Sequence, residues 1–232
     1  MKTPYALIIL AILFITSCGN TTLRLKLSRS GVGFLSKKEC LDFLVSNTGL
    51  NKYKTYLSDF QENDTIGRYY RIDRSGHYLA YIQGFLLETD KNGRFIQVKQ
   101  RYDNTTYCYC LENEHDKFRK IRDSFCITLC QTGLGYYACY LQLCREFPKG
   151  DLTTIPYMVS YLSGENIQTL TGEMEFKNDV EMIMHYSIEE GIIIDDIFKS
   201  CSIRNFTVKY VYRNNSWQTD EYEKFKGTPV EF

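Results

Sequence analysis

The sequence predicts an all-β fold, mostly antiparallel, with about 8–10 strands arranged as a barrel or sandwich and with one or two short helices. Three observations lead to this expectation. The chain has 19 tyrosines and 14 phenylalanines but only 4 prolines among 232 residues, and aromatic side chains suit half-buried strands. Apolar and polar residues alternate with period two over much of the chain after residue 66. The 9 cysteines indicate that disulfides stabilise the fold.

The first residues are typical of an export signal. Lys2 is followed by an uncharged apolar run from Ala6 to Ile15 and then by the small residues Thr16 and Ser17. This run is short for a membrane span, and no later run reaches about 18 apolar residues. The remaining length allows one large domain or two small ones. We expect a signal peptide at 1–18, an N-terminal extension at 19–35 and a single β-rich domain, preceded by a short helix, at 36–232.

The first expected element is a helix at 36–47. Ser36 and Glu39 have the spacing of a capping box, and Gly49 ends the helical pattern. The apolar positions of this helix follow at helical spacing, at Cys40, Leu41, Leu44 and Val45. Cys40 on the apolar side is expected to attach the helix to the core.

Three strands are expected next, at 66–73, 78–88 and 95–103. The last two are joined by Asp90-Lys91-Asn92-Gly93, in which Asn-Gly suits a tight hairpin. A further strand is expected at 105–111. Phe118, Ile121 and Phe125 recur at helical spacing and predict a second short helix within 114–125. The stretch 126–147, with four cysteines and two glycines, is expected to be irregular and to end in a strand.

Alternation returns after residue 150 and predicts further strands up to about residue 225. Met182, Met184 and Tyr186 alternate there with Ile183 and His185. Turn residues separate the expected strands at 163–166, 177–179, 190–191 and 214–215.

Removal or lipidation of Cys18 leaves eight cysteines, an even number that predicts up to four disulfides in an exported chain. Cys108 and Cys110 alternate on a strand and are expected to bond to different partners. The spacing of the four cysteines from 126 to 144 is also acceptable for zinc, but disulfides are the preferred interpretation and no metal is expected. The disulfide candidates are Cys40, Cys108, Cys110, Cys126, Cys130, Cys139, Cys144 and Cys201.

The end of the leader allows two interpretations. Ile15-Thr16-Ser17-Cys18 is acceptable as a bacterial lipobox, which would make Cys18 a lipidated first residue. The chain also contains five Asn-x-Ser/Thr sequons, against about two expected by chance. Their number favours a secreted glycoprotein over a lipoprotein of the bacterial outer membrane. The glycosylation candidates are Asn20, Asn63, Asn104, Asn205 and Asn214.

The region 66–100 resembles the opening of a lipocalin. Gly67-Arg68-Tyr69-Tyr70 is similar to the Gly-x-Trp-Tyr of that family's first strand, and an Asn-Gly hairpin follows. Tyr69 stands where the family has tryptophan, and the cysteine cluster departs from the family pattern. The resemblance implies an eight-stranded cup that binds one small ligand. It assigns Tyr69, Tyr81 and Phe85 as ligand-binding residues.

Catalytic chemistry is not expected. The three histidines, His77, His115 and His185, are interpreted as solvated side chains, the last on the outer face of a strand. No serine nucleophile elbow, phosphate loop or zinc-protease motif occurs in the sequence. No motif indicates a cofactor, and none is expected.

We therefore expect a secreted, non-catalytic binding protein whose partner is a small apolar or amine ligand or an extracellular protein. The charges balance, with 28 lysines and arginines against 28 aspartates and glutamates, so a nucleic-acid partner or a polybasic membrane surface is not expected. Two alternatives stay open: a bacterial envelope lipoprotein with a structural or assembly role, and a secreted enzyme of unrecognised type.

Overall fold

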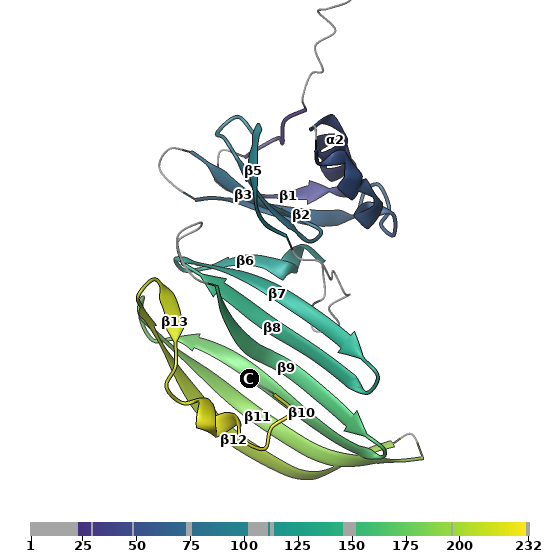
Figure 1. The fold of residues 1–232 in the computed structure, drawn as a ribbon, viewed down its shortest axis with the longest axis vertical. Coiled ribbons are helices and arrows are strands. Elements are labelled where there is room, and N and C mark those ends of the chain that lie inside the picture. The colour runs from purple at the N-terminus through teal and green to yellow at the C-terminus, as the bar shows by residue number, and fades with distance from the viewer. Residues whose placement is uncertain are drawn as a thin grey trace, which may run out of the picture. The chain divides into compact units, whose positions relative to one another are not determined.

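The structure of the protein is a computed structural model. It describes residues 23–28, 30–47, 49–72, 76–101, 111, 114–145, 152–195 and 197–230. These residues form 13 strands, one α-helix and three short 3-10 helices (Figure 1). The all-β prediction is confirmed. The described strands make two open sheets and no closed barrel, each sheet a meander in which consecutive strands are neighbours.

The chain divides into two compact units, where the sequence favoured one domain over 36–232. The first unit contains Met1–Gln83 and Leu87–Val98, and the second contains Gly84–Leu86 and Lys99–Phe232. The two units correspond to two separately hydrogen-bonded sheets, one of five strands and one of eight, except that Gly84–Leu86 and Lys99–Arg101 belong to the second unit.

The five-stranded sheet is formed by the strands up to residue 101. Its order is β1, β2, β3, β4, β5, and the bounds are Val32–Ser36, Thr65–Arg71, Tyr78–Ile82, Phe85–Thr89 and Phe95–Arg101. The expected single strand at 78–88 is a hairpin instead, since the chain turns at Gln83 and Gly84, both with positive φ. All ten residues of β3 and β4 are buried, so no change in hydrophobic alternation marks this turn.

The hairpin at 90–93 is confirmed. The backbone N–H of Asp90 donates to the carbonyl of Arg94 (2.9 Å), and the N–H of Gly93 donates to the carbonyl of Asp90 (3.0 Å). Gly93 adopts φ +74°, which glycine tolerates without steric cost.

Helix α2 (Lys37–Ser46) begins at the predicted capping box. The backbone N–H of Glu39 donates to Ser36 Oγ (3.3 Å), and the N–H of Ser36 donates to the Glu39 carboxylate (2.9 Å). Both bonds satisfy donors that the first helical turn leaves without intrahelical partners.

The buried face of α2 differs from the expected one. Phe43 is buried there, whereas Val45 is 49% exposed. Cys40 is buried on this face, and its sulfur lies over Gly67 of β2, where a Cβ would be only 3.2 Å away. Attachment of the helix to the core through a disulfide of Cys40 stays a prediction. This helix is followed by the 3-10 helix η1 (Asn51–Leu57).

The eight-stranded sheet follows chain order from β6 at one edge to β13 at the other. Its strands are Phe118–Ile121, Ser124–Gly133, Tyr136–Cys144, Thr153–Ser163, Asn166–Phe176, Glu181–Ile194, Ile197–Arg213 and Ser216–Gln218. Strands are thus present after residue 150 as predicted, except that the last one, expected up to about residue 225, ends at Gln218 and is followed by a 3-10 helix at Tyr222–Phe225. The turn expected at Glu190-Gly191 is wrong, since these residues continue β11 and lie opposite a bulge at Cys201 of β12.

Two further expectations for this sheet are also wrong. Only Glu114–Lys117 is helical (η2), and the rest of the predicted helix is the hairpin of β6 and β7. In the hairpin the rings of Phe118 and Phe125 stack on each other, 5.9 Å apart. These residues contact each other across two strands, so their sequence spacing resembles that of a helix although no helix forms there. The stretch expected to be irregular is the regular hairpin of β7 and β8.

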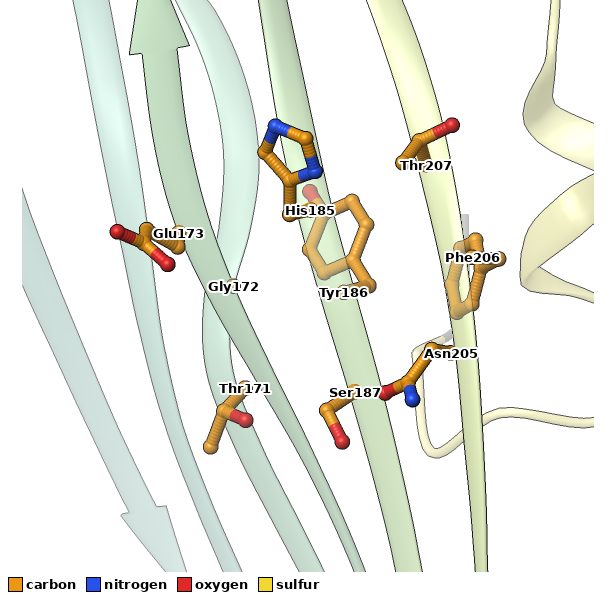
Figure 2. Close-up of a pocket in the computed structure, with 9 residues that line it drawn as sticks. All are labelled: Thr171, Gly172, Glu173, His185, Tyr186, Ser187, Asn205, Phe206 and Thr207. Carbon is orange, nitrogen blue, oxygen red and sulfur yellow. The ribbon is translucent and has the colours of Figure 1, made fainter.

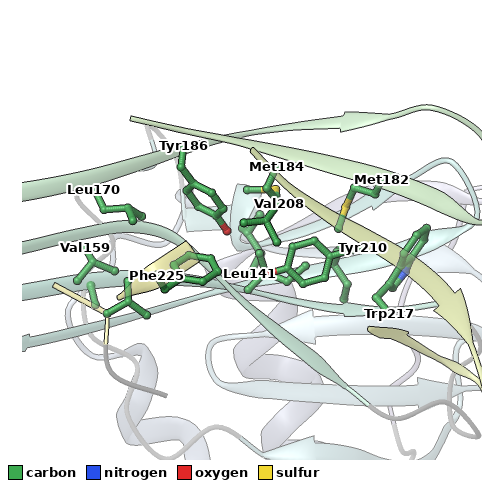
Figure 3. Packing of buried hydrophobic residues seen from close by; sticks show 14 of the residues in the cluster. Leu141, Val159, Leu170, Met182, Met184, Tyr186, Val208, Tyr210, Trp217 and Phe225 are labelled. Carbon is green, nitrogen blue, oxygen red and sulfur yellow. The ribbon is translucent and has the colours of Figure 1, made fainter. Parts of the chain in front are cut away.

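The core of the second unit lies on one face of this sheet. Cross-strand neighbours Ala138, Val159, Leu170 and Ile188 form one buried row across four strands. Tyr186, Tyr210 and Phe225 extend this core (Figure 3). Gly172 leaves space for Tyr186, whose hydroxyl donates to the carbonyl of Pro156 (2.9 Å).

The C-terminal segment, residues 219–230, covers part of this core face. It contains the 3-10 helix η3 (Tyr222–Phe225). The Phe225 ring lies 5.1 Å from the ring of Tyr186 and 5.6 Å from that of Phe206. This segment therefore covers the part of the core around Tyr186 and Phe206.

Candidate functional site

A row of polar and aromatic side chains crosses the core face of β8 to β12, beside the buried apolar row. Strand register places its members directly opposite one another on five neighbouring strands, namely Tyr136, Tyr161, Gln168, Glu190 and Ser202. Side chains opposite one another on antiparallel strands are about 5 Å apart at Cβ, so they act as a group.

Glu190 is held in this row by two hydrogen bonds. Gln168 Nε2 donates to Glu190 Oε1 (2.8 Å), and Ser202 Oγ donates to Glu190 Oε2 (3.0 Å). The bond from Gln168 and then the bond from Ser202 lower the pKa of the Glu190 carboxyl below its usual range. The carboxylate therefore stays ionised under mildly acidic conditions as well as at neutral pH.

Tyrosine rings and the C-terminal segment form the walls around this row. The hydroxyls of Tyr136 and Tyr140 lie 2.7 Å apart, and Gln168 Nε2 also donates to the carbonyl of Gly227 (3.3 Å). The side chain of Tyr161 is 48% exposed.

Two hollows meet at this place, because Tyr161 and Gln168 line both. One has a volume of about 570 Å³ and is also lined by Tyr136, Tyr140, Gly227, Thr228 and Pro229. The other has a volume of about 310 Å³ and includes Glu190 and Cys201 in its wall. We call the combined site the tyrosine groove, formed by Tyr136, Tyr140, Tyr161, Gln168, Glu190 and Gly227–Pro229.

The chemistry of the tyrosine groove is that of a binding site. Tyrosine rings offer apolar faces that also attract cations, and their hydroxyls exchange hydrogen bonds with a ligand. The ionised Glu190 adds one negative charge, and the positive charge of Arg204 acts on this carboxylate and also lowers its pKa. No histidine is among the described residues that line the two hollows.

A second site lies on the opposite face of the same sheet. A hollow of about 720 Å³ spans β10, β11 and β12, and we call it the outer hollow. Figure 2 shows its polar side chains in two rows of cross-strand neighbours, Glu173, His185 and Thr207 in one and Thr171, Ser187 and Asn205 in the other. His185 Nε2 also lies 3.0 Å from Glu175 Oε2.

The residues assigned from the lipocalin resemblance lie in the five-stranded sheet. Tyr69, Tyr81 and Phe85 are all at most 3% exposed. Tyr69 accepts a hydrogen bond from the backbone N–H of Ser28 (2.7 Å), and its ring stacks edge-on against Tyr78. None of the three lines the tyrosine groove or the outer hollow. Their role in ligand binding stays a prediction.

The described cysteines have different surroundings. Cys130 and Cys139 are opposite each other on β7 and β8 with their sulfurs in contact, 3.1 Å apart, which is longer than the S–S bond length of about 2.05 Å. Cys40, Cys126 and Cys201 are free cysteines with no disulfide to another described cysteine. Burial raises the pKa of Cys126 to about 11.

Cys144 is buried, and Cys201 is exposed in the bulge of β12. Cys108 and Cys110 lie outside the described residues. Disulfide formation after export therefore stays a prediction, and among the described cysteines Cys130 and Cys139 are the pair whose geometry comes closest to it. No three His, Cys, Asp or Glu side chains within the described part of the chain converge as a metal site would require.

The histidines have defined surroundings where the structure describes them. His77 was interpreted as a solvated turn residue, but its Nδ1 lies 2.8 Å from a carboxylate oxygen of the buried Glu88. Gln97 Nε2 donates to the other oxygen of Glu88 (2.9 Å). His185 lies on the outer face of β11, as its alternation indicated. Nothing is described for the side chain of His115.

Three of the five sequons lie in described parts of the chain. Asn63, Asn205 and Asn214 are all exposed. Asn20, Asn104 and the possible lipid attachment residue Cys18 lie outside the described residues. None of the described helices is long and apolar enough to cross a membrane.

The groove tyrosines were missed in the sequence because Tyr136 and Tyr140 fall in the stretch expected to be irregular. Once β8 is recognised as a strand, their spacing of four places them on the same side of it in a regular strand. Their meeting with Glu190 depends on the register of four strands.

Comparison of the chain with protein-family models, curated proteins and solved structures finds no match. The lipocalin resemblance therefore stays a prediction.

Proposed function

We propose that this chain is a secreted, non-catalytic binding protein and that the tyrosine groove is its ligand site. The observation that carries the proposal is the placement of an ionised carboxylate, Glu190, in one row with Tyr161 and Tyr136. Such an arrangement suits a small organic cation, because aromatic faces and a carboxylate both attract positive charge.

A protonated amine with an apolar body is the ligand class that fits best. The amine would pair with Glu190, and the apolar body would lie against the rings of Tyr140 and Tyr161. The same carboxylate repels fatty-acid headgroups. Two expectations from the sequence support the proposal. The chain has a predicted export signal, and it has no predicted catalytic residues, which a binding protein does not need.

The proposal is tested by fluorescence titration of the purified full chain with a dansylated alkylamine and, in parallel, with a dansylated fatty acid. We expect saturable binding of the amine at micromolar concentration and weaker binding of the acid. Glu190→Gln is expected to weaken amine binding about fivefold, as removal of an exposed charge pair does.

Glu173→Gln is the matched control, because Glu173 is an exposed glutamate on the opposite face of the same sheet. It should leave amine affinity unchanged. Amine affinity should persist as the pH falls to the ordinary pKa of glutamate, about 4.3, and decline below it because the groove lowers the pKa of Glu190. Absence of saturable amine binding by the folded protein would exclude the proposed site.

A further inference from the structure

The outer hollow contains both functional residues of one sequon, Asn205-Phe206-Thr207. In β12 the side chains of Asn205 and Thr207 lie on the outer face, and both line the hollow (Figure 2). Phe206 points to the other face, where its ring stacks on that of Tyr186 at 5.1 Å. The core thus fixes the middle residue and holds the asparagine and the threonine outward.

The hollow is suited in size and chemistry to a sugar ring. Its volume of about 720 Å³ lies within the range of about 300–1,000 Å³ that small-molecule sites occupy. Carboxylate, imidazole and hydroxyl groups line it, from Glu173, His185, Thr171 and Ser187. These groups are donors and acceptors that match sugar hydroxyls and an acetamido group.

The other described sequons lack such surroundings. Asn63 lies in the turn before β2, and Asn214 lies in the turn between β12 and β13, where it adopts φ +52°. Neither lines the outer hollow or the tyrosine groove. Asn205 is therefore the described sequon at which an attached sugar would meet a preformed surface.

Asn205 also lies on the long free edge of the eight-stranded sheet. β13 pairs with β12 only at Val211–Arg213. At Thr207 and Lys209, side chains of the C-terminal segment bind the edge of β12 instead. The Glu221 carboxylate accepts a hydrogen bond from the backbone N–H of Lys209 (2.8 Å), and Lys224 Nζ donates one to the carbonyl of Thr207 (2.9 Å). Among the described strands, none pairs with the other side of β12 from residue 197 to 205. An edge of this kind promotes association unless it is covered.

We propose that Asn205 carries an N-linked glycan whose first sugar lies in the outer hollow and whose bulk shields the free edge of β12. In the transfer, Asn205 Nδ2 forms a bond to the anomeric carbon of a lipid-pyrophosphate-linked oligosaccharide. The bond from that carbon to the phosphate oxygen breaks, the lipid pyrophosphate leaves with the electron pair, and Nδ2 loses one proton. The inference is independent of the tyrosine groove, which lies on the opposite face.

The test uses the full chain made in a secretory host that attaches N-glycans. The native glycoprotein is treated with a peptide N-glycosidase in ¹⁸O water, and the mass of each sequon peptide is followed over time. Asn205 should be occupied, and its glycan should be released at least tenfold more slowly than that of Asn214, because the seated sugar is shielded. An unoccupied Asn205, or equal release rates at the two sites, overturns the proposal.

Variants provide the second measurement. Glu173→Ala and His185→Ala should bring release at Asn205 toward the rate at Asn214, and Thr207→Ala should abolish occupancy while Thr207→Ser retains it. Asn205→Gln should increase concentration-dependent self-association in analytical ultracentrifugation, whereas the matched Asn214→Gln should not. If neither Glu173→Ala nor His185→Ala changed the rate of glycan release from Asn205, the first sugar would not lie in the outer hollow.

Discussion

Gly172 determines how Tyr186 packs in the core of the second unit. A Cβ placed on Gly172 would lie 2.8 Å from Tyr186 Cε1 and 2.9 Å from Met184 Cε. The hydroxyl of Tyr186 is held by Pro156, so the ring cannot move away without losing that hydrogen bond. Burial raises the pKa of Tyr186 far above its ordinary value, and the hydroxyl stays protonated as a donor.

Gly172→Ala is therefore expected to destabilise the second unit by about 1–3 kcal/mol, the usual cost of overpacking a core. Urea unfolding followed by the fluorescence of Trp217, the single tryptophan and a buried core residue, measures this change. Gly133→Ala is the control, since its Cβ would meet only Tyr136 Cβ, at 3.9 Å. Equal free energies of unfolding for the two variants would contradict the packing described for Gly172.

At the scale of elements, the C-terminal segment covers part of the core face of the eight-stranded sheet. Phe225 is 3% exposed and packs on two aromatic rings, whereas Tyr222 in the same 3-10 helix is 52% exposed. A helix of this length has little stability of its own, so its position depends on the packing of Phe225.

Phe225→Ala should lower the free energy of unfolding by about 3–5 kcal/mol, as truncation of a buried phenylalanine does. Tyr222→Ala, with the same element and a similar loss of ring area, should change it by less than about 1 kcal/mol. Trp217 fluorescence in urea again reports the transition. A small effect of Phe225→Ala would show that the segment does not contribute to the core as described.

On the scale of the whole molecule, two sheets with separate hydrogen-bonded ladders are expected to open separately. Each unit contains a buried thiol whose reactivity can report the opening of that unit, Cys40 in the first and Cys126 in the second. Cys201, in contrast, is exposed. Burial raises the pKa of both buried thiols, so they react with alkylating reagents only after local or global opening.

Alkylation followed by peptide mass mapping should label Cys201 first in the native protein and the two buried thiols much later. Phe225→Ala should accelerate labelling of Cys126 more than that of Cys40. Ser36→Ala, which removes the helix cap and costs about 1 kcal/mol, should do the reverse. Ser36→Thr retains a capping hydroxyl and is the control. Equal acceleration of both thiols by each variant would show that the two units open together.

Local features were predictable from the sequence because they depend on neighbours within a few residues. The capping box at Ser36 and Glu39, the turn at Asp90–Gly93 and the period-two strands β10 and β11 are of this kind. The hairpins at Gln83–Gly84 and in β7–β8 were missed because fully buried strands and a run of cysteines hide the alternation that marks a strand.

The sequence by itself determined that the chain is a β protein, because aromatic content and apolar–polar alternation are properties of each strand alone and do not depend on which strands pair. Only the tertiary structure decided that there are two open sheets and that Tyr136, Tyr161, Gln168 and Glu190 form one row. The physical reason is register. A shift of one residue in any of these strands would move its side chain to the opposite face, and no local pattern fixes four registers at once.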